Sequence, residues 1–324
     1  MKIRNCLLST IPFLLTFFST AGFAQESAQD WLMKMSLAAK NMNYDGKFVY
    51  QHGNQLEAMR ITHQANNNGV RERLVSLNGA PREIIRNNDM VRCYLPDEDS
   101  VMVSSRNPQA KKFPGLLPSS MERLNESYLI KTGKISRIAN RSAQLILIRP
   151  QDRYRYGYRL WADTKTGLLL KADLVNQQGE SLEQFMFTDI EINKSLSDSD
   201  FEPSFDNSKM VWHKEPGSPK KELSQSNWRA QRLPKGFNLT ASLNRFKPTK
   251  GEPMIHLVYS DGLAAVSVFI ERGHGDSASM SQGANQMGAV HAYRAMVEGY
   301  QVTVVGEVPA ETVEMIGSSI TMTE

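Results

Sequence analysis

The chain has 324 residues, and its formal net charge of +4 falls by two when the basic residues of an N-terminal leader are removed. So small a positive excess excludes a protein that neutralises many phosphates, and we do not expect nucleic-acid binding. Without the leader, Cys93 is the one remaining thiol, which excludes an intramolecular disulfide. We interpret it as a small buried strand residue rather than a reactive thiol.

The first 24 residues have the pattern of a secretory signal peptide. Lys2 and Arg4 precede an apolar run from Cys6 to Phe18, and small residues follow at positions 22 and 24. We therefore expect a signal peptide over 1–24 and a periplasmic mature chain. No later segment approaches the roughly 20 apolar residues that a transmembrane helix needs.

A helix and an antiparallel meander are predicted for the first part of the mature chain. Apolar residues at helical spacing predict a helix over Ser27–Met42. Short alternating runs separated by Gly, Asn, Asp and Pro turns then predict strands. These strands are Lys47–His52, Leu56–Gln64, Arg71–Leu77, Arg82–Arg86, Met90–Leu95, Val101–Ser104, Ala143–Ile148, Tyr154–Trp161, Leu168–Val175 and Leu182–Ile192. One helix with one long sheet predicts an α+β fold, in which a half-open antiparallel barrel wraps around helices.

An apolar loop interrupts this meander at Phe113–Pro118. Its two prolines and its glycine exclude a central strand, and we expect a short helix to follow at Ser119–Leu124. Phe113, Leu116 and Leu117 either plug the open mouth of the sheet or form a movable lid over a groove for lipid or a partner. These three residues are candidate lipid-binding residues.

The predicted strand Tyr154–Trp161 alternates between aromatic and basic residues. Two interpretations stay open: an aromatic core face backed by a solvated basic face, or an apolar surface for acyl chains with a cationic rim for phosphate. The second interpretation makes lipid-binding candidates of Tyr154, Tyr156, Tyr158, Arg155 and Arg159, and it places Arg153 on the same basic face.

A change of composition separates two domains. Ser, Asp, Pro, Lys and Glu dominate the chain between Ser197 and Asn227, which predicts a linker at 206–226 between domains at 25–205 and 227–324. The second domain contains a predicted hairpin of Met254–Tyr259 and Leu263–Ile270, joined by an Asp-Gly turn. A strand at Gln301–Val305 and a helix from Pro309, with Val313, Ile316 and Ile320 on one face, complete a smaller antiparallel sheet-and-helix domain.

No catalytic centre is expected. The sequence lacks a Gly-x-Ser-x-Gly elbow, a His-Glu-x-x-His pair, paired-cysteine zinc spacing and a glycine-rich phosphate loop. Its six histidines never stand two together at metal-ligand spacing. We therefore expect neither an enzyme, nor a metal site, nor a cofactor.

Seven segments, in order along nearly the whole mature chain, resemble the RseB/MucB family. They are the start of the meander from Asn43-Tyr44 to His63, Leu77–Glu83, Trp161–Thr164, Gly179–Phe185, Leu233–Phe237, Tyr259–Leu263 and Val305–Pro309. The resemblance implies a large N-terminal domain similar to the lipoprotein carriers LolA and LolB, with an apolar cavity, and a smaller C-terminal sheet domain.

The resemblance also implies a function in envelope stress. Such proteins restrain a sigma factor of the sigma-E or AlgU type by binding the periplasmic part of a membrane anti-sigma factor, RseA or MucA, and shielding it from proteolysis. Lipopolysaccharide or an acylated lipoprotein would release the partner, and a homodimer is compatible with the family. The C-terminal domain would bind the partner, with candidate residues Trp228, Phe237, Tyr259 and Phe269. The alternative is a periplasmic lipid or lipoprotein carrier.

Overall fold

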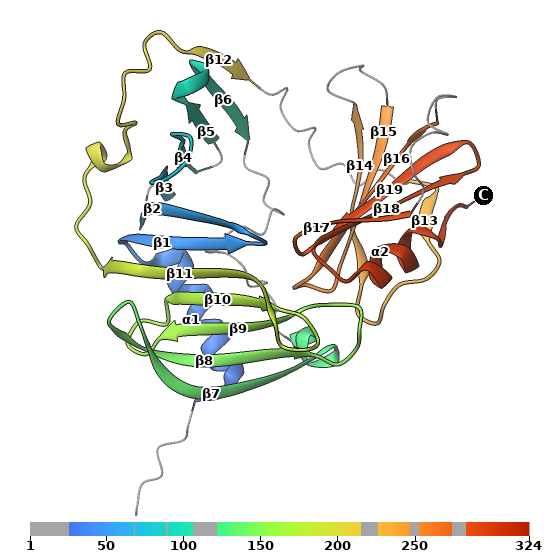
Figure 1. Cartoon of the computed structure of the whole chain (residues 1–324), viewed down its shortest axis with the longest axis horizontal. Coiled ribbons are helices and arrows are strands. Elements are labelled where there is room, and N and C mark those ends of the chain that lie inside the picture. Colours follow the sequence, from blue (N-terminus) through green and yellow to red (C-terminus); the bar gives the residue numbers. More distant parts are fainter. Residues whose placement is uncertain are drawn as a thin grey trace, which may run out of the picture.

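The computed structural model describes residues 26–67, 69–88, 90–105, 122–214, 226–246, 253–273 and 283–323. Figure 1 shows two domains side by side, a larger one made of residues up to 214 and a smaller one made of residues from 226 on. The predicted leader at 1–24 and the predicted loop Phe113–Pro118 lie outside the described residues.

A 12-stranded sheet forms the N-terminal domain, in the order β12-β6-β5-β4-β3-β2-β1-β11-β10-β9-β8-β7. All neighbouring strands are antiparallel except β12 and β6, which are parallel. The strands are β1 (Tyr44–His52), β2 (Gln55–Asn66), β3 (Gly69–Ser76), β4 (Glu83–Asn87), β5 (Met90–Leu95), β6 (Ser100–Ser105), β7 (Tyr128–Ile138), β8 (Arg141–Pro150), β9 (Gly157–Asp163), β10 (Leu169–Val175), β11 (Ser181–Ile192) and β12 (Val211–Lys214). The order ends at β12 and β7, so within the described residues the curved sheet stays open (Figure 1), which confirms the half-open barrel.

Helix α1 (Ala28–Asn41) packs against this sheet and fills the domain's core. Ser27 begins the helix with a capping box, in which its hydroxyl accepts from the backbone N–H of Asp30. Trp31, Leu32 and Met35 form the buried face of the helix. Burial of these side chains with the inward-facing residues of β1, β8, β9 and β11 provides the main favourable free energy for the domain.

The C-terminal domain is a six-stranded antiparallel sheet in the order β14-β15-β16-β19-β18-β17, with a helix and a small two-stranded sheet. Its elements are β13 (Trp228–Ala230), β14 (Asn238–Phe246), β15 (Pro253–Ser260), β16 (Ala265–Arg272), β17 (Gly283–Met287), β18 (Val290–Val297), β19 (Tyr300–Gly306), α2 (Ala310–Gly317) and β20 (Ile320–Met322). Val313 and Ile316 of α2 are buried in the core of this domain, as predicted. Ile320 instead lies in β20, because the helix ends at Gly317 and the chain then pairs with β13.

Several predicted elements differ from the structure. The sequence did not predict β7, β13, β14, β17 or β18. Part of the predicted linker at 206–226 forms β12, an edge strand paired with β6. The predicted strand Tyr154–Trp161 begins only at Gly157, because the Asp152 carboxylate accepts the backbone N–H of Tyr154 and holds the preceding residues in a bend. Glu122–Glu126 is a 3-10 helix, η2, and Cys93 in β5 is only half-buried.

His63 on β2 should make the stability of the chain depend on pH. Its ring stacks on Tyr44 at 4.8 Å and its Nδ1 donates to the carbonyl of Met42 at 2.8 Å, while Glu72 lies 3.5 Å from Nε2. Burial lowers the pKa of His63 to about 4, and the nearby Arg86 adds to this effect. The unfolded chain, with an ordinary histidine pKa, therefore binds more protons at mildly acidic pH.

We therefore expect the contribution of His63 to be complete above about pH 6.5 and to be lost as the pH falls towards the folded pKa, by up to about 1.4 kcal/mol per pH unit. Replacing His63 by Phe keeps a ring on Tyr44 and removes the titration. The free energy of unfolding in urea should then fall less between about pH 7 and about pH 5 than in the wild type. An equal fall in both proteins would contradict this role of His63.

Candidate functional site

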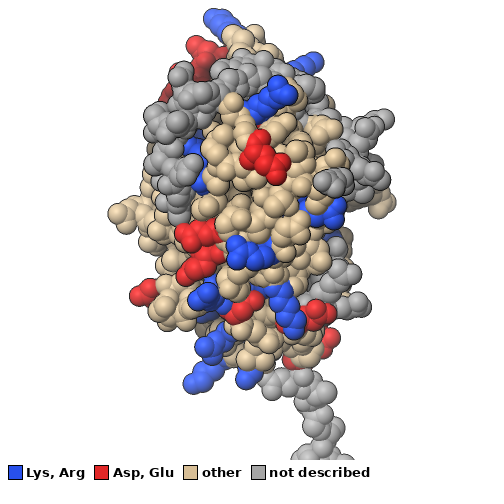
Figure 2. Space-filling model, turned by 90° about the vertical axis from the view of Figure 1, so that its right-hand side faces the viewer, with Lys and Arg blue, Asp and Glu red and all other residues tan. Residues whose placement is uncertain are grey.

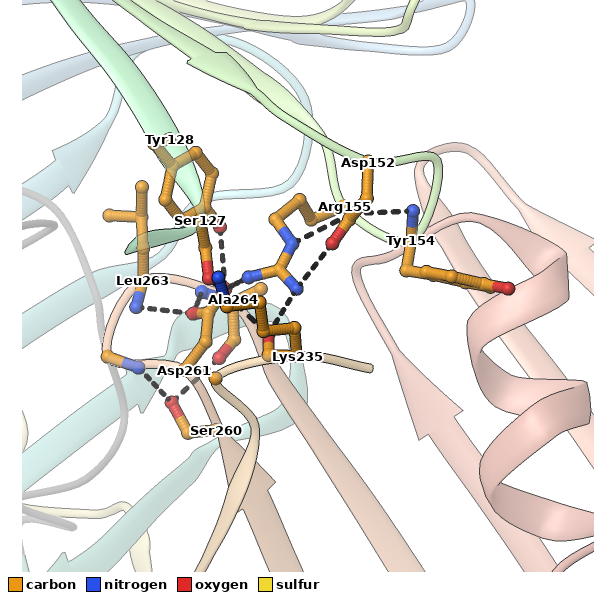
Figure 3. Close-up of polar contacts among 12 residues, drawn as sticks. Ser127, Tyr128, Asp152, Tyr154, Arg155, Lys235, Ser260, Asp261, Leu263 and Ala264 are labelled. Atoms are coloured by element: carbon orange, nitrogen blue, oxygen red, sulfur yellow. Dashed lines mark hydrogen bonds and ion pairs between the residues drawn. The ribbon is translucent and has the colours of Figure 1, made fainter. Parts of the chain in front are cut away.

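Arg155, in the loop between β8 and β9, lies at the junction of the two domains. Its side chain is fully buried. Its guanidinium donates to both carboxylate oxygens of Asp152, at 3.0 and 2.9 Å, and across the junction to Asp261 Oδ2 at 2.6 Å and to the carbonyl of Lys235 at 2.6 Å. Figure 3 shows the guanidinium held between the two carboxylates. One cation therefore links a loop of the first domain to two segments of the second.

Asp261, in the turn between β15 and β16, uses both of its carboxylate oxygens. Oδ2 accepts from Arg155 and from the hydroxyl of Tyr128, at 2.8 Å. Oδ1 accepts from the backbone N–H groups of Leu263 and Ala264, at 2.8 and 2.7 Å, which builds the hairpin turn. Its side chain is 1% exposed, so the Arg155–Asp261 ion pair is withdrawn from water.

Two aromatic rings complete the environment of Arg155. The guanidinium carbon lies 5.4 Å from the ring centre of Tyr128 and 5.1 Å from that of Phe237, one ring from each domain. Burial opposes the charged form of Arg155, but the hydrogen bond to Asp152 and the charge of Asp261 outweigh it and raise the pKa of Arg155. Burial, followed by the charge of Asp261, raises the pKa of Tyr128, so its hydroxyl remains a donor.

Gly236 allows the backbone of the second domain to approach this cluster. Its φ is +83°, and a Cβ there would lie 2.7 Å from the hydroxyl oxygen of Ser127. Both the conformation and the close approach require glycine. The neighbouring carbonyl of Lys235 accepts from Ser127 at 3.3 Å as well as from Arg155.

Apolar side chains continue the junction beyond the ion pair. Leu263, at the tip of the β15–β16 hairpin, is 5% exposed and belongs to the core of the N-terminal domain. On another side, Tyr156 and Leu174 pack with Ala289 of the second domain. Tyr156 also approaches Nδ1 of His291, at 3.4 Å. The two domains are therefore in contact through buried apolar side chains at two places.

The junction contains hydrogen bonds that depend on orientation, and their ion pair is buried. Removing one partner of a buried ion pair leaves the other charge without compensation and costs about 3–5 kcal/mol. Thr312 of α2 adds a further contact, donating to the carbonyl of Tyr154 at 2.7 Å. The arrangement can fix one domain against the other, a role that needs no bond to be made or broken.

An open groove of about 390 Å³ lies beside the junction. Arg153 and Tyr154 of the first domain line it, together with residues of the second domain, namely Arg232, Tyr293, Glu311, Glu314, Met315 and Ser318. Charges of both signs are also interspersed over the face of the molecule that Figure 2 shows. A mixed surface of this kind favours a polypeptide over a polyanion.

The structure corrects the cationic rim expected from the predicted strand Tyr154–Trp161. Arg155 is buried in the domain junction rather than exposed with its neighbours, because Asp261 and Asp152 compensate its charge. Arg159 pairs with Asp173 at 3.0 Å and donates to Ser181, both within the first domain. Tyr154 is half-buried, Tyr156 is buried between the domains, and Tyr158 packs against the core.

The predicted partner-binding residues mostly stabilise the second domain. Trp228 and Tyr259 are 3% and 2% exposed, and the hydroxyl of Tyr259 accepts from the backbone of Ala230. Phe237 is buried against Arg155, and the half-buried Phe269 stacks on His256 at 4.4 Å. Trp228, Phe237 and Tyr259 are thus buried in this arrangement, and their role in partner binding stays a prediction.

Sequence reasoning missed the cluster itself. Its members Asp152, Tyr128 and Asp261 come from three separate segments. No role was predicted for Asp152 or Tyr128, and Asp261 was predicted only as a turn residue. Two of the segments that carry the family resemblance, Leu233–Phe237 and Tyr259–Leu263, meet at Arg155. These segments therefore indicated the second domain's part of the site, but they did not indicate that it pairs with Arg155.

The described residues contain neither a metal-binding cluster nor a membrane-spanning helix. No group of three or more His, Cys, Asp or Glu side chains is placed to hold a metal ion within the described ranges. None of the helices in the described part of the chain is both long and apolar enough to cross a membrane.

Two family models match the chain. The MucB/RseB N-terminal domain matches residues 27–205, and the MucB/RseB C-terminal domain matches residues 222–321. The sigma factor AlgU regulatory protein MucB of Pseudomonas aeruginosa is 33% identical over 298 residues, which cover 90% of each chain. The sigma-E factor regulatory protein RseB of Escherichia coli is 27% identical and covers 94% of this chain and 93% of its own.

Solved structures agree with this assignment. A crystal structure of MucB in complex with MucA(peri) aligns with a TM-score of 0.71 and 31% identity, over 92% of this chain and 99% of that one. A crystal structure of MucB aligns with a TM-score of 0.61 and 30% identity, over 91% and 98% of the two chains. With both domains matched, in order and over nearly their full lengths, this chain belongs to the MucB/RseB family.

Proposed function

We propose that this chain is a periplasmic regulator of an envelope-stress sigma factor, and that it acts by binding the periplasmic part of a membrane anti-sigma factor. The observation that carries the proposal is the likeness, over both domains, to MucB in its complex with MucA(peri). The signal-peptide pattern of residues 1–24 supports the periplasmic location. Binding would protect the anti-sigma factor from proteolysis, so the chain regulates by occupancy and not by catalysis.

Lipopolysaccharide or an acylated lipoprotein is the proposed releasing ligand, and the N-terminal domain is its proposed site. The support is the open sheet packed on α1, together with the family resemblance. Arg155 is not part of this proposed site, because its guanidinium is fully engaged at the domain junction.

A lipid or lipoprotein carrier is the second candidate. The open N-terminal sheet favours it, since transport of an acyl chain needs only that domain. The junction argues against it, because the second domain packs into the core of the first through Leu263. A carrier would gain nothing from a second domain fixed in this way.

Affinity purification from envelope extracts tests the proposal. We expect the tagged mature chain to retain a single-pass membrane protein with an anti-sigma domain, identified by mass spectrometry. An unrelated tagged periplasmic protein is the control bait. Retention of outer-membrane lipoproteins alone would favour the carrier and contradict the regulator.

A further inference from the structure

We propose that Arg155 is a positioning residue, whose buried ion pair with Asp261 fixes the single arrangement of the two domains that the partner recognises. The part of this proposal that concerns the partner rests on the proposed function. The part that concerns the arrangement of the domains rests on the junction alone.

The hydrogen bonds of Arg155 depend on the orientation of the two domains, whereas the apolar contacts do not. Leu263 and the Tyr156–Ala289 contact hold the domains together, but burial of apolar surface is non-directional. The guanidinium is planar and donates to four acceptor atoms on three residues, Asp152, Asp261 and Lys235. A rotation of one domain would break hydrogen bonds to Arg155 before it uncovered much apolar surface.

Both carboxylates that bind Arg155 are themselves held in place. Asp152 is held by accepting the backbone N–H of Tyr154, and Asp261 by the turn that its Oδ1 builds. Tyr128 donates to Asp261 from the start of β7, at the edge of the first domain's sheet. The cluster therefore joins rigid parts of both domains rather than side chains that could follow a movement.

The arrangement of the domains also shapes an accessible surface. The groove beside the junction takes Arg153 and Tyr154 from the first domain and Arg232, Tyr293 and Glu311 from the second. Its shape exists only while the two domains keep this arrangement. A partner that contacts both sides binds one arrangement better than others, so loss of the ion pair would weaken binding although Arg155 itself is out of the partner's reach.

Replacement of Arg155 by Met is the test, with Arg159→Met as its matched control. Arg159 also pairs with an aspartate, Asp173, but within the first domain. Spin labels on Cys at the exposed positions Leu37 of α1 and Leu239 of β14, in a Cys93→Ser background, report the distance between the domains. We expect one narrow distance distribution for the wild type and for Arg159→Met, and a broadened or shifted distribution for Arg155→Met.

The same proteins are titrated with the periplasmic domain of the MucA-type protein from the same genome. We expect Arg155→Met to bind it at least about tenfold more weakly than Arg159→Met does, a change of about 1.4 kcal/mol. An unchanged distance distribution, or unchanged affinity despite a changed distribution, would overturn the proposal. If the wild type itself does not bind, the proposed function fails, and the distance measurement still decides the role of Arg155.

A double variant separates the ion pair from stability, in case Arg155→Met folds poorly. Arg155→Met with Asp261→Asn leaves no uncompensated charge at the buried position 261, and the Asn oxygen can still accept from Leu263 and Ala264. The Asp152 carboxylate loses Arg155 as well, but its side chain is 27% exposed and can be hydrated. We expect this variant to fold and to keep the broadened distribution and the weak binding. Wild-type distances and affinity in the double variant would show that the apolar contacts alone fix the arrangement, and would refute the proposal.

Discussion

Replacing Leu263 by aspartate is expected to separate the two domains and to lower the stability of the whole chain. Leu263 belongs to the second domain by sequence but is 5% exposed within the core of the first. A carboxylate in its place would lose about 1.5–3 kcal/mol of apolar burial and would be desolvated without a partner, so we expect a total loss of about 4 kcal/mol or more.

Leu239→Asp is the control for this substitution, because Leu239 is an equally large side chain of the same domain and is 48% exposed. Calorimetric melting of the mature chain measures both variants. We expect Leu263→Asp to replace the wild-type melting curve by two separate transitions at lower temperature, and Leu239→Asp to leave the curve nearly unchanged. If both variants melt like the wild type, Leu263 does not link the domains.

A chain that ends at Lys214 is expected to lose the partner. The truncation keeps all 12 strands of the N-terminal sheet but removes Asp261 and Leu263, and so exposes the apolar surface around Tyr128. We expect a folded domain that melts at a lower temperature than the full chain. Its affinity for the anti-sigma segment should fall at least about 100-fold, or about 2.7 kcal/mol.

Protease protection measures this loss directly. The periplasmic segment of the anti-sigma factor is digested in the presence of either the truncated or the full mature chain, at equal concentrations. We expect protection only by the full chain. Equal protection by the truncated chain would assign partner binding to the N-terminal domain alone.

The parts of the fold that were predictable are those in which one local pattern decides the structure. Trp31, Met35 and Ala38 recur at helical spacing and lie on the buried face of α1. The Asp261-Gly262 turn between alternating runs predicted the β15–β16 hairpin correctly. The family resemblance and the half-open sheet are likewise confirmed.

One missed strand, β12, lacks such a pattern. Strand β12 has four exposed residues, and pairing with β6 rather than its own composition makes Val211–Lys214 a strand. Its Trp212 ring contacts Tyr94 edge-on, a neighbour that is distant in sequence. The composition of this segment predicted a linker, but its contacts with distant residues make it a strand.

Arg155 illustrates why the site itself was not predictable. The alternation of Arg and Tyr from Arg153 to Arg159 suggested a strand with one basic face, but a bend held by Asp152 turns Arg155 inward. Its partner Asp261 is separated from it by 106 positions, in a turn that the sequence explained completely as a hairpin. A buried ion pair between domains leaves no periodic signal in either segment.

Calorimetric titration measures directly whether this chain binds the periplasmic part of an anti-sigma factor. The full mature chain is titrated with the purified periplasmic domain of the MucA-type protein from the same genome, with the domain of Pseudomonas aeruginosa MucA as a second probe. We expect saturable binding of the first probe with a Kd below about 1 µM, a free energy of about −8 kcal/mol. Absence of binding at concentrations up to about 100 µM would contradict it.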